Sequence, residues 1–156
     1  MKDYDKVSRY KRIIGQLDEL IPKTDNLISR FATTCALLHY KIPYFFWTGF
    51  YLLQNEKLLV GPYQGPLACQ ELEKNKGVCW NAINNRKTVI VPDVHKFPGH
   101  IACDSRSNSE IAVPIFNKNQ YIIGVLDIDS KSLNSFDEID MENLEKIISL
   151  LEKDTV

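Results

Sequence analysis

The sequence has no long hydrophobic run. Its longest apolar stretches, such as residues 44–47 and 121–126, fall far short of the roughly 18 residues that a membrane-spanning helix needs. Residues 1–6 are charged and lead into no apolar segment of the signal-peptide type. We therefore expect no membrane partner and a cytoplasmic location.

An excess of charge, internal repeats and low-complexity tracts are also missing. The 19 basic and 20 acidic residues leave a formal net charge of −1, which gives no global attraction for nucleic acid or anionic lipid. Hydrophobic residues make up 44% and charged residues 25% of 156 residues, as in an average globular domain. We expect one domain over 1–156 that binds a small molecule or a protein and no nucleic acid.

Cysteine is scarce, and none of the four cysteines belongs to a CxxC pair. In a reducing compartment thiols are more often buried, metal-bound or catalytic than joined in structural disulfides. Cys35 falls on the apolar stripe of a predicted helix, so we expect it in the core. Cys69, Cys79 and Cys103 fall in the loop-rich middle of the chain. These three are the candidates for thiol chemistry.

Helical patterns lie at both ends of the chain and strand patterns between them. Residues 1–42 hold two predicted helices, the second capped by Thr24. The first has the apolar stripe Tyr4, Val7, Ile14, Leu17 and Ile21. Residues 43–156 hold predicted strands at 45–53, 57–63, 89–91, 110–116 and 121–129, a helical turn at 77–84, and a final helix after a Ser135–Glu138 capping box.

This order predicts an α+β domain with an antiparallel sheet. The N- and C-terminal helices are expected to pack on one face of the sheet. The long irregular segment 92–109 is of the kind that is usually functional or disordered. We therefore place a loop-covered ligand pocket on the other face.

The last hairpin allows its register to be predicted. If Lys118 and Asn119 form a two-residue turn, Glu110 lies opposite Asp127. Asp129 lies two residues along the same strand and shares that face. The opposite, helix-covered face then carries Ile111, Val113, Ile115, Ile122, Leu126 and Ile128. No Lys or Arg of the hairpin shares the acidic face, so a bound ammonium, a metal cation or a held proton must compensate, unless the acids point into water.

The loop thiols and histidines have two interpretations. His95, His100, Cys103 and Cys79 could bind zinc, although the His-x4-His-x2-Cys spacing is not a strong metal pattern. Redox chemistry fits better, because a second thiol can condense with a sulfenic acid formed on the first. Nearby carboxylates favour a cationic substrate whose leaving oxygen needs a proton. We expect His95 to bond to backbone and His39 to end the second helix without a chemical role.

Six blocks in one order resemble the free methionine-(R)-sulfoxide reductases, which are single GAF domains. They are Trp-Thr-Gly-Phe-Tyr at 47–51, Gly-Val-Cys at 77–79, Pro-Asp-Val-His at 92–95, Gly-His-Ile-Ala-Cys-Asp at 99–104, Ser-Glu-Ile at 109–111 and Gly-Val-Leu-Asp-Ile-Asp-Ser at 124–130. The resemblance implies a GAF fold and reduction of free L-methionine-(R)-sulfoxide to L-methionine without a cofactor.

The resemblance also implies roles for the thiols. Cys103 matches the family's catalytic cysteine, which attacks the sulfoxide sulfur and becomes a sulfenic acid. Cys69 matches a resolving thiol and Cys79 a further one, and thioredoxin would reduce the resulting disulfide. The family usually has glycine after the residue that Cys79 matches, whereas this chain has Trp80, which would narrow the pocket or stiffen the turn.

The substrate-binding residues follow in the same way. Glu110, Asp127 and Asp129 match the family's substrate-binding acids, and Trp47 and Tyr51 match aromatic residues that would enclose the methyl group. GAF domains commonly pair through an early helix, so a homodimer is also open to this chain. A GAF sensor that binds a small ligand without turnover and a zinc-binding module are the alternative functions.

Overall fold

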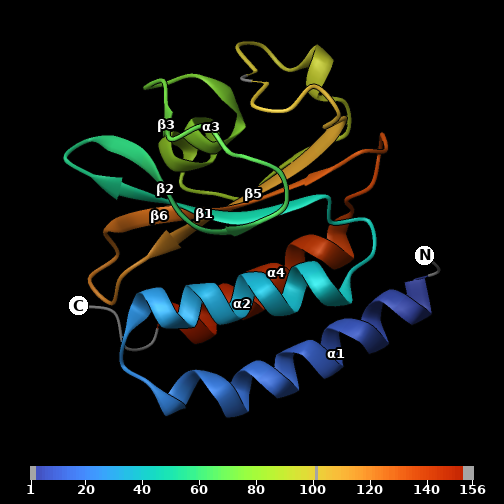
Figure 1. Ribbon diagram of the computed structural model, residues 1–156, viewed down its shortest axis with the longest axis vertical. Coiled ribbons are helices and arrows are strands. Elements are labelled where there is room, and N and C mark those ends of the chain that lie inside the picture. The colour runs from blue at the N-terminus through green and yellow to red at the C-terminus, as the bar shows by residue number, and fades with distance from the viewer. Residues whose placement is uncertain (1–2, 101, 153–156) are drawn as a thin grey trace.

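The protein is an antiparallel sheet with helices on both faces (Figure 1). The computed structural model describes residues 3–100 and 102–152. The elements are α1 (Asp3–Leu20), the short 3-10 helix η1 (Ile21–Lys23), α2 (Leu27–Lys41), β1 (Trp47–Gln54), β2 (Lys57–Gln64), β3 (Glu71–Leu72), α3 (Gly77–Asn85), β4 (Val89–Val91), the 3-10 helix η2 (Val94–Lys96), β5 (Ser109–Phe116), β6 (Ile122–Ser130) and α4 (Glu138–Glu152). The six strands lie in the order β3-β2-β1-β6-β5-β4. The predicted α+β architecture is confirmed.

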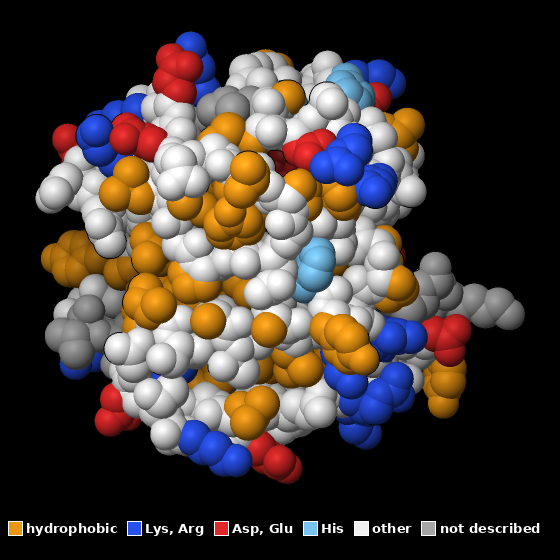
Figure 2. Space-filling view, in the orientation of Figure 1, with side chains coloured by type: hydrophobic (Ala, Val, Ile, Leu, Met, Phe, Trp, Pro, Cys, Tyr) orange, Lys and Arg blue, Asp and Glu red, His pale blue; other side chains and the backbone are white. Residues whose placement is uncertain are grey.

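The helices divide unequally between the two faces. Helices α2 and α4 pack on one face, with α1 outside them, and α3 and the long loops cover the other face (Figure 1). Basic and acidic side chains are scattered over the surface seen in Figure 2, in keeping with the small net charge. No helix in the described ranges is long and apolar enough to cross a membrane.

The main core lies between the sheet and α2 and α4. Phe31 of α2 and Phe50 of β1 stack with ring centroids 4.1 Å apart. The predicted stripe of α4 is fully buried, with Leu144, Ile147, Ile148 and Leu151 at most 2% exposed. Cys35 is buried as predicted, and its thiol donates to the Pro62 carbonyl oxygen over 3.2 Å. Cys35 is therefore a packing residue of the core, as its place in the helical stripe predicts.

The stripe predicted for helix α1 is only partly correct. Leu17 and Ile21 are buried as predicted, whereas Tyr4 and Val7 are 82% and 50% exposed. In the N-terminal half of the helix the buried residues are Lys6, Tyr10 and Ile13. The reason is electrostatic, because the Lys6 ammonium lies 2.6 Å from Asp140 and 2.7 Å from Asp137 of the α4 N-terminus. Burial lowers the pKa of Lys6, but these two carboxylates outweigh it and raise the pKa overall.

Both predicted helix caps are displaced by two residues. Asn26 caps α2, since its Oδ1 accepts the Ser29 amide over 2.9 Å, and Thr24 only orients the Asn26 amide. For α4, Asp137 and Asp140 accept each other's backbone amides over 3.1 and 3.0 Å. This pair replaces the predicted Ser135–Glu138 capping box, because Asp side chains cap as well as Ser and Asp140 also holds Lys6.

The last hairpin has a longer loop than predicted. The Asn117 amide donates to the Tyr121 carbonyl, which leaves three loop residues, 118–120, with Gln120 at a φ of 65°. A second register shift lies between Ile115 and Phe116. Ile122 therefore packs on the pocket side, and Ile123 packs in the helix-side core in its place.

Beyond the second shift, the pairing of the two strands changes but the face on which the acids lie does not. Glu110 lies opposite Asp129, and Ala112 lies opposite Asp127. The predicted Glu110–Asp127 pair is therefore wrong by two residues. Because side chains alternate with a period of two, a shift of two keeps each side chain on its face. The prediction that all three acids share the face away from the main core is confirmed.

We expect Lys6→Met to lower the free energy of unfolding by about 3–5 kcal/mol, because it leaves the buried Asp140 without its cation. Urea denaturation followed by circular dichroism measures the loss. Lys11→Met, on the exposed side of the same helix, is the matched control and should change stability by less than about 0.5 kcal/mol. Equal stability of the two variants would contradict this account of α1.

Candidate active site

A pocket lies on the sheet face that carries the acids. Strands β1, β5 and β6 form its floor, and its walls are α3, part of the loop 65–70, and His100 and residues 103–107 of the next loop. Its lining residues are Trp47, Tyr51, Leu67, Ala68, Leu72, Lys76, Gly77, Val78, Cys79, His100, Cys103, Asp104, Ser107, Glu110, Asp127 and Asp129. The cavity of about 50 Å³ is several times the ~10–15 Å³ that one water requires. A small polar ligand is the kind of molecule that such a pocket suits.

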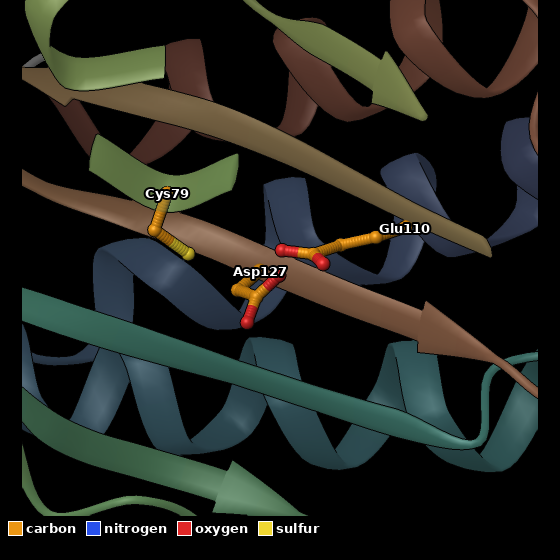
Figure 3. Close-up of side chains that lie close together, drawn as sticks. All are labelled: Cys79, Glu110 and Asp127. Atoms are coloured by element: carbon orange, nitrogen blue, oxygen red, sulfur yellow. The ribbon is translucent and has the colours of Figure 1, made fainter. Parts of the chain in front are cut away.

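Three carboxylates and one thiol converge on the pocket floor. Glu110 and Asp127 are only 6% and 7% exposed. Figure 3 shows their side chains pointing toward one another and toward Cys79, from β5, β6 and α3 respectively. One ligand atom from each of these three residues lies within 4.8 Å of the others. Asp129 lies directly across the ladder from Glu110 and completes the acidic group.

Burial and mutual repulsion raise the pKa of all three carboxyls. Burial is the largest cause for each, and a neighbouring carboxylate adds to it: Asp129 for Glu110, Glu110 for Asp127, and Asp127 for Asp129. A hydrogen bond from Ser107 partly offsets the rise in the pKa of Asp129. A raised pKa favours the protonated form of a carboxyl, which is the form that can donate a proton.

The loop thiols are joined across the mouth of the pocket. Cys69 and Cys103 form a disulfide with their Cα atoms 5.5 Å apart, although 34 residues separate them in the chain. Cys103 is exposed and Cys69 half-buried, so this bond is accessible from solvent.

Cys79 lies in the first turn of α3 and is a free thiol that is only 3% exposed. Burial and the facing acids Asp127 and Glu110 raise its pKa well above the ordinary value. These surroundings disfavour the thiolate that nucleophilic chemistry needs.

The aromatic wall depends on a glycine that the sequence argument did not single out. The Trp47 ring stacks between Tyr51 and Tyr63, with centroids 5.8 and 5.4 Å away. A Cβ at Gly49 would overlap the Trp47 ring and the Tyr63 Cβ. The Trp47 indole N–H donates to the Pro66 carbonyl, and the Tyr51 hydroxyl donates to the Cys69 carbonyl over 3.0 Å. The wall is thereby tied to the Cys69 loop.

Two polar residues of the pocket were also missed as site residues. Ser107 is 7% exposed and hydrogen-bonds to Asp129. His100 was considered only as a zinc ligand, but its Nε2 lies 3.5 Å from Glu110, and burial lowers its pKa. Both lie in an irregular loop, where no periodic pattern indicates which side chains turn inward.

The zinc site considered for His95, His100, Cys103 and Cys79 does not assemble in the described residues. His95 is exposed, and its ring nitrogen lies 2.8 Å from the Asn108 side-chain oxygen, so the expected backbone partner is wrong. Cys103 is in the disulfide. His39 ends α2, where its ring contacts the Thr48 hydroxyl over 3.3 Å.

The Trp80 side chain fixes α3 to β3 at Leu72 and does not reach the pocket. Its indole N–H donates to the Leu72 carbonyl over 3.3 Å, and the side chain is 4% exposed. It does not line the pocket. Of the two effects predicted for it, stiffening of the turn is the one that the contacts support.

Comparison with known proteins identifies the family. The GAF domain family matches residues 46–152 of the 156, so the chain belongs to that family. Free methionine-R-sulfoxide reductase of Escherichia coli (strain K12) is 40% identical over 149 residues, which cover 96% of this chain and 90% of that protein. GAF domain-containing protein A of Dictyostelium discoideum is 47% identical over 148 residues, which cover 94% and 92%.

A solved structure gives the same result. Free methionine-R-sulfoxide reductase from Neisseria meningitidis, solved in complex with its substrate, matches with a TM-score of 0.91 and 38% identity over 99% of this chain and 91% of that one. Within the GAF family, the chain therefore groups with the free methionine-R-sulfoxide reductases, and the resemblance indicated by the six sequence blocks is confirmed.

We expect iodoacetamide to label two of the four cysteines, Cys35 and Cys79, when the oxidised protein is unfolded without reductant. The other two are protected because they are joined to each other. Peptide mass mapping identifies the labelled positions, and prior reduction should expose all four. A disulfide-linked peptide containing Cys79 would contradict this pairing.

Proposed function

We propose that this protein reduces free L-methionine-(R)-sulfoxide to L-methionine with a cysteine nucleophile. The observation that carries the proposal is a solvent-accessible pair of loop cysteines at the mouth of a pocket floored by three carboxyls. The relatives from E. coli and N. meningitidis are reductases of this class, and the latter was solved with its substrate.

The pocket chemistry suits a free amino acid that carries a positive charge. One carboxylate of the acidic group would pair with the substrate ammonium, which a peptide-bound residue lacks. A neighbouring carboxyl that keeps its proton would donate it to the sulfoxide oxygen. The stacked rings of Trp47 and Tyr51 offer an apolar wall for the S-methyl group.

Cys103 is the proposed nucleophile. Its sulfur attacks the sulfoxide sulfur, the sulfoxide oxygen is protonated and passes to the cysteine, and methionine leaves. The sulfoxide is thus reduced by two electrons, and Cys103 is oxidised to the sulfenic acid. This route requires no metal or organic cofactor.

Cys69 is the proposed resolving thiol. It attacks the sulfenic sulfur of Cys103, releases water and forms the disulfide that joins the two loops. Cys79 is the poorer candidate for this step, because its thiol is buried and its pKa is raised. Thioredoxin, a dithiol reductant, would then exchange with the accessible bond and restore both thiols.

The location and assembly of the protein follow from the same proposal. A cytoplasmic location supplies the dithiol reductant that each cycle consumes. A homodimer packed through α1 agrees with the exposure of Tyr4 and Val7 on that helix.

We expect Cys103→Ser to lower methionine formation by at least about 1000-fold, because the nucleophile is lost. The assay incubates the protein with racemic free methionine sulfoxide and either dithiothreitol or thioredoxin with its reductase, and measures methionine by amino-acid analysis. Cys35→Ala, which removes a core thiol, should retain activity.

Full activity of Cys103→Ser would end the proposal. The alternative, a sensor without turnover, predicts no methionine and a ligand-induced rise in Tm that survives replacement of all three pocket thiols.

We expect Asp129→Asn to lower kcat/KM about 10- to 100-fold, the equivalent of a charge-assisted hydrogen bond of about 1.5–3 kcal/mol. The amide keeps the shape of the side chain but cannot be an anion. Glu56→Gln, in the exposed β1–β2 turn, is the control and should leave kcat/KM unchanged. Equal values for both variants would show that Asp129 does not bind the substrate.

A further inference from the structure

The pocket floor contains a group of side chains with the composition of a metal site. The Cys79 sulfur and one carboxylate oxygen each from Glu110 and Asp127 lie within 4.8 Å of one another, and all three residues are buried. They come from α3, β5 and β6, so three separate elements of the rigid scaffold hold them (Figure 3). This group shares Cys79 with the zinc site considered from the sequence, but it replaces the loop residues His95, His100 and Cys103 with Glu110 and Asp127.

A second observation points to a ligand at this place. Asp127 is only 7% exposed, and its side chain interacts with Glu110 and Cys79 of the same group, but its buried Oδ1 atom has no hydrogen-bond partner among the described residues. Buried carboxylate oxygens are nearly always satisfied by a donor, a water or a metal ion. An oxygen without a donor at the centre of such a group has the character of an unused metal ligand.

The cations near the pocket are engaged elsewhere. The Lys76 ammonium pairs with Glu73, within hydrogen-bond distance, and the Arg106 guanidinium pairs with Asp104 over 2.7 Å. The His100 ring lies 3.5 Å from a Glu110 oxygen, close enough to orient that carboxylate as outer-sphere partners of metal ligands do. Neither of these two cations therefore neutralises the cluster of Cys79, Glu110 and Asp127.

We propose that Cys79, Glu110 and Asp127 form a binding site for a thiophilic divalent cation such as Zn²⁺. A thiolate with two carboxylates suits Zn²⁺ and Co²⁺ and disfavours Mg²⁺ and Ca²⁺, which prefer oxygen ligands alone. Tetrahedral ligands at about 2.0–2.3 Å from zinc lie roughly 3.5 Å apart, so side-chain shifts of about 1 Å would close the site. Water completes the coordination.

Occupation of this site has a consequence for turnover. Glu110 and Asp127 belong to the acidic group proposed to bind the substrate, so a bound Zn²⁺ would exclude free methionine sulfoxide. The metal would then act as an inhibitor. This consequence rests on the proposed function, whereas metal binding itself does not.

The test is a Co²⁺ titration of the full-length oxidised protein, in which Cys35 and Cys79 are the free thiols. We expect one equivalent to bind with a thiolate-to-cobalt charge-transfer band, and Zn²⁺ to displace it. Cys79→Ser should abolish the band, and the isosteric Asp127→Asn should weaken binding at least about 100-fold, as expected for loss of one of few ligands. Cys35→Ala, the control thiol, should change neither.

Absence of stoichiometric Co²⁺ binding to the wild-type protein would overturn the proposal, as would a charge-transfer band that survives Cys79→Ser. Substrate exclusion is measured in the Cys69→Ser, Cys103→Ser double variant, which cannot turn over. Displacement of Co²⁺ by free methionine sulfoxide supports a shared site. Co²⁺ binding that the substrate does not disturb would contradict the proposed substrate acids and leave the metal site standing.

Discussion

The constraint on which the site depends is the crowding of three carboxyls on one face of a sheet, with Glu110 and Asp127 buried and Asp129 half-buried. Desolvation and mutual repulsion disfavour their charged forms, and no neighbouring Lys or Arg among the pocket-lining residues pairs with them. Buried like charges lower stability unless a proton or a cation compensates. The remainder of the fold therefore has to supply the stability, and the same group is ready to take up a positively charged ligand.

The opposite face of the sheet supplies that stability. There the residues that alternate with the acids, such as Ile111 and Ile128, are fully buried against α2 and α4. Lys6 fastens α1 to the start of α4 through two carboxylates. One strand thus serves two purposes, because its side chains alternate between a hydrocarbon core and a polar pocket.

Sequence patterns predicted the layers, the acidic face and the burial of Cys35, but not the local geometry. The hairpin register was wrong because nothing marks Gln120 as a residue with positive φ. A glycine within a strand often signals a bulge, and Gly124, next to the second register shift, is such a signal. The stripe of α1 was wrong at Tyr4 and Val7 because hydrophobic periodicity cannot anticipate a buried lysine whose partners lie more than 130 residues away. Ser107 and His100 lie in an irregular loop, where no periodic pattern predicts which side chains face the pocket.

The thiols are placed so that the nucleophilic cysteine is kept apart from the buried acids, whose charges would oppose its ionisation. A nucleophilic thiol needs to ionise, and nearby carboxylates oppose ionisation. Cys79 lies among the acids and has a strongly raised pKa, whereas Cys103 lies on an exposed loop at the pocket mouth. The acids can therefore bind a cation or hold a proton without suppressing the thiol at the mouth. The Cys69–Cys103 bond joins two loops beside the pocket, with Cys103 exposed, so a dithiol reductant can reach it from solvent.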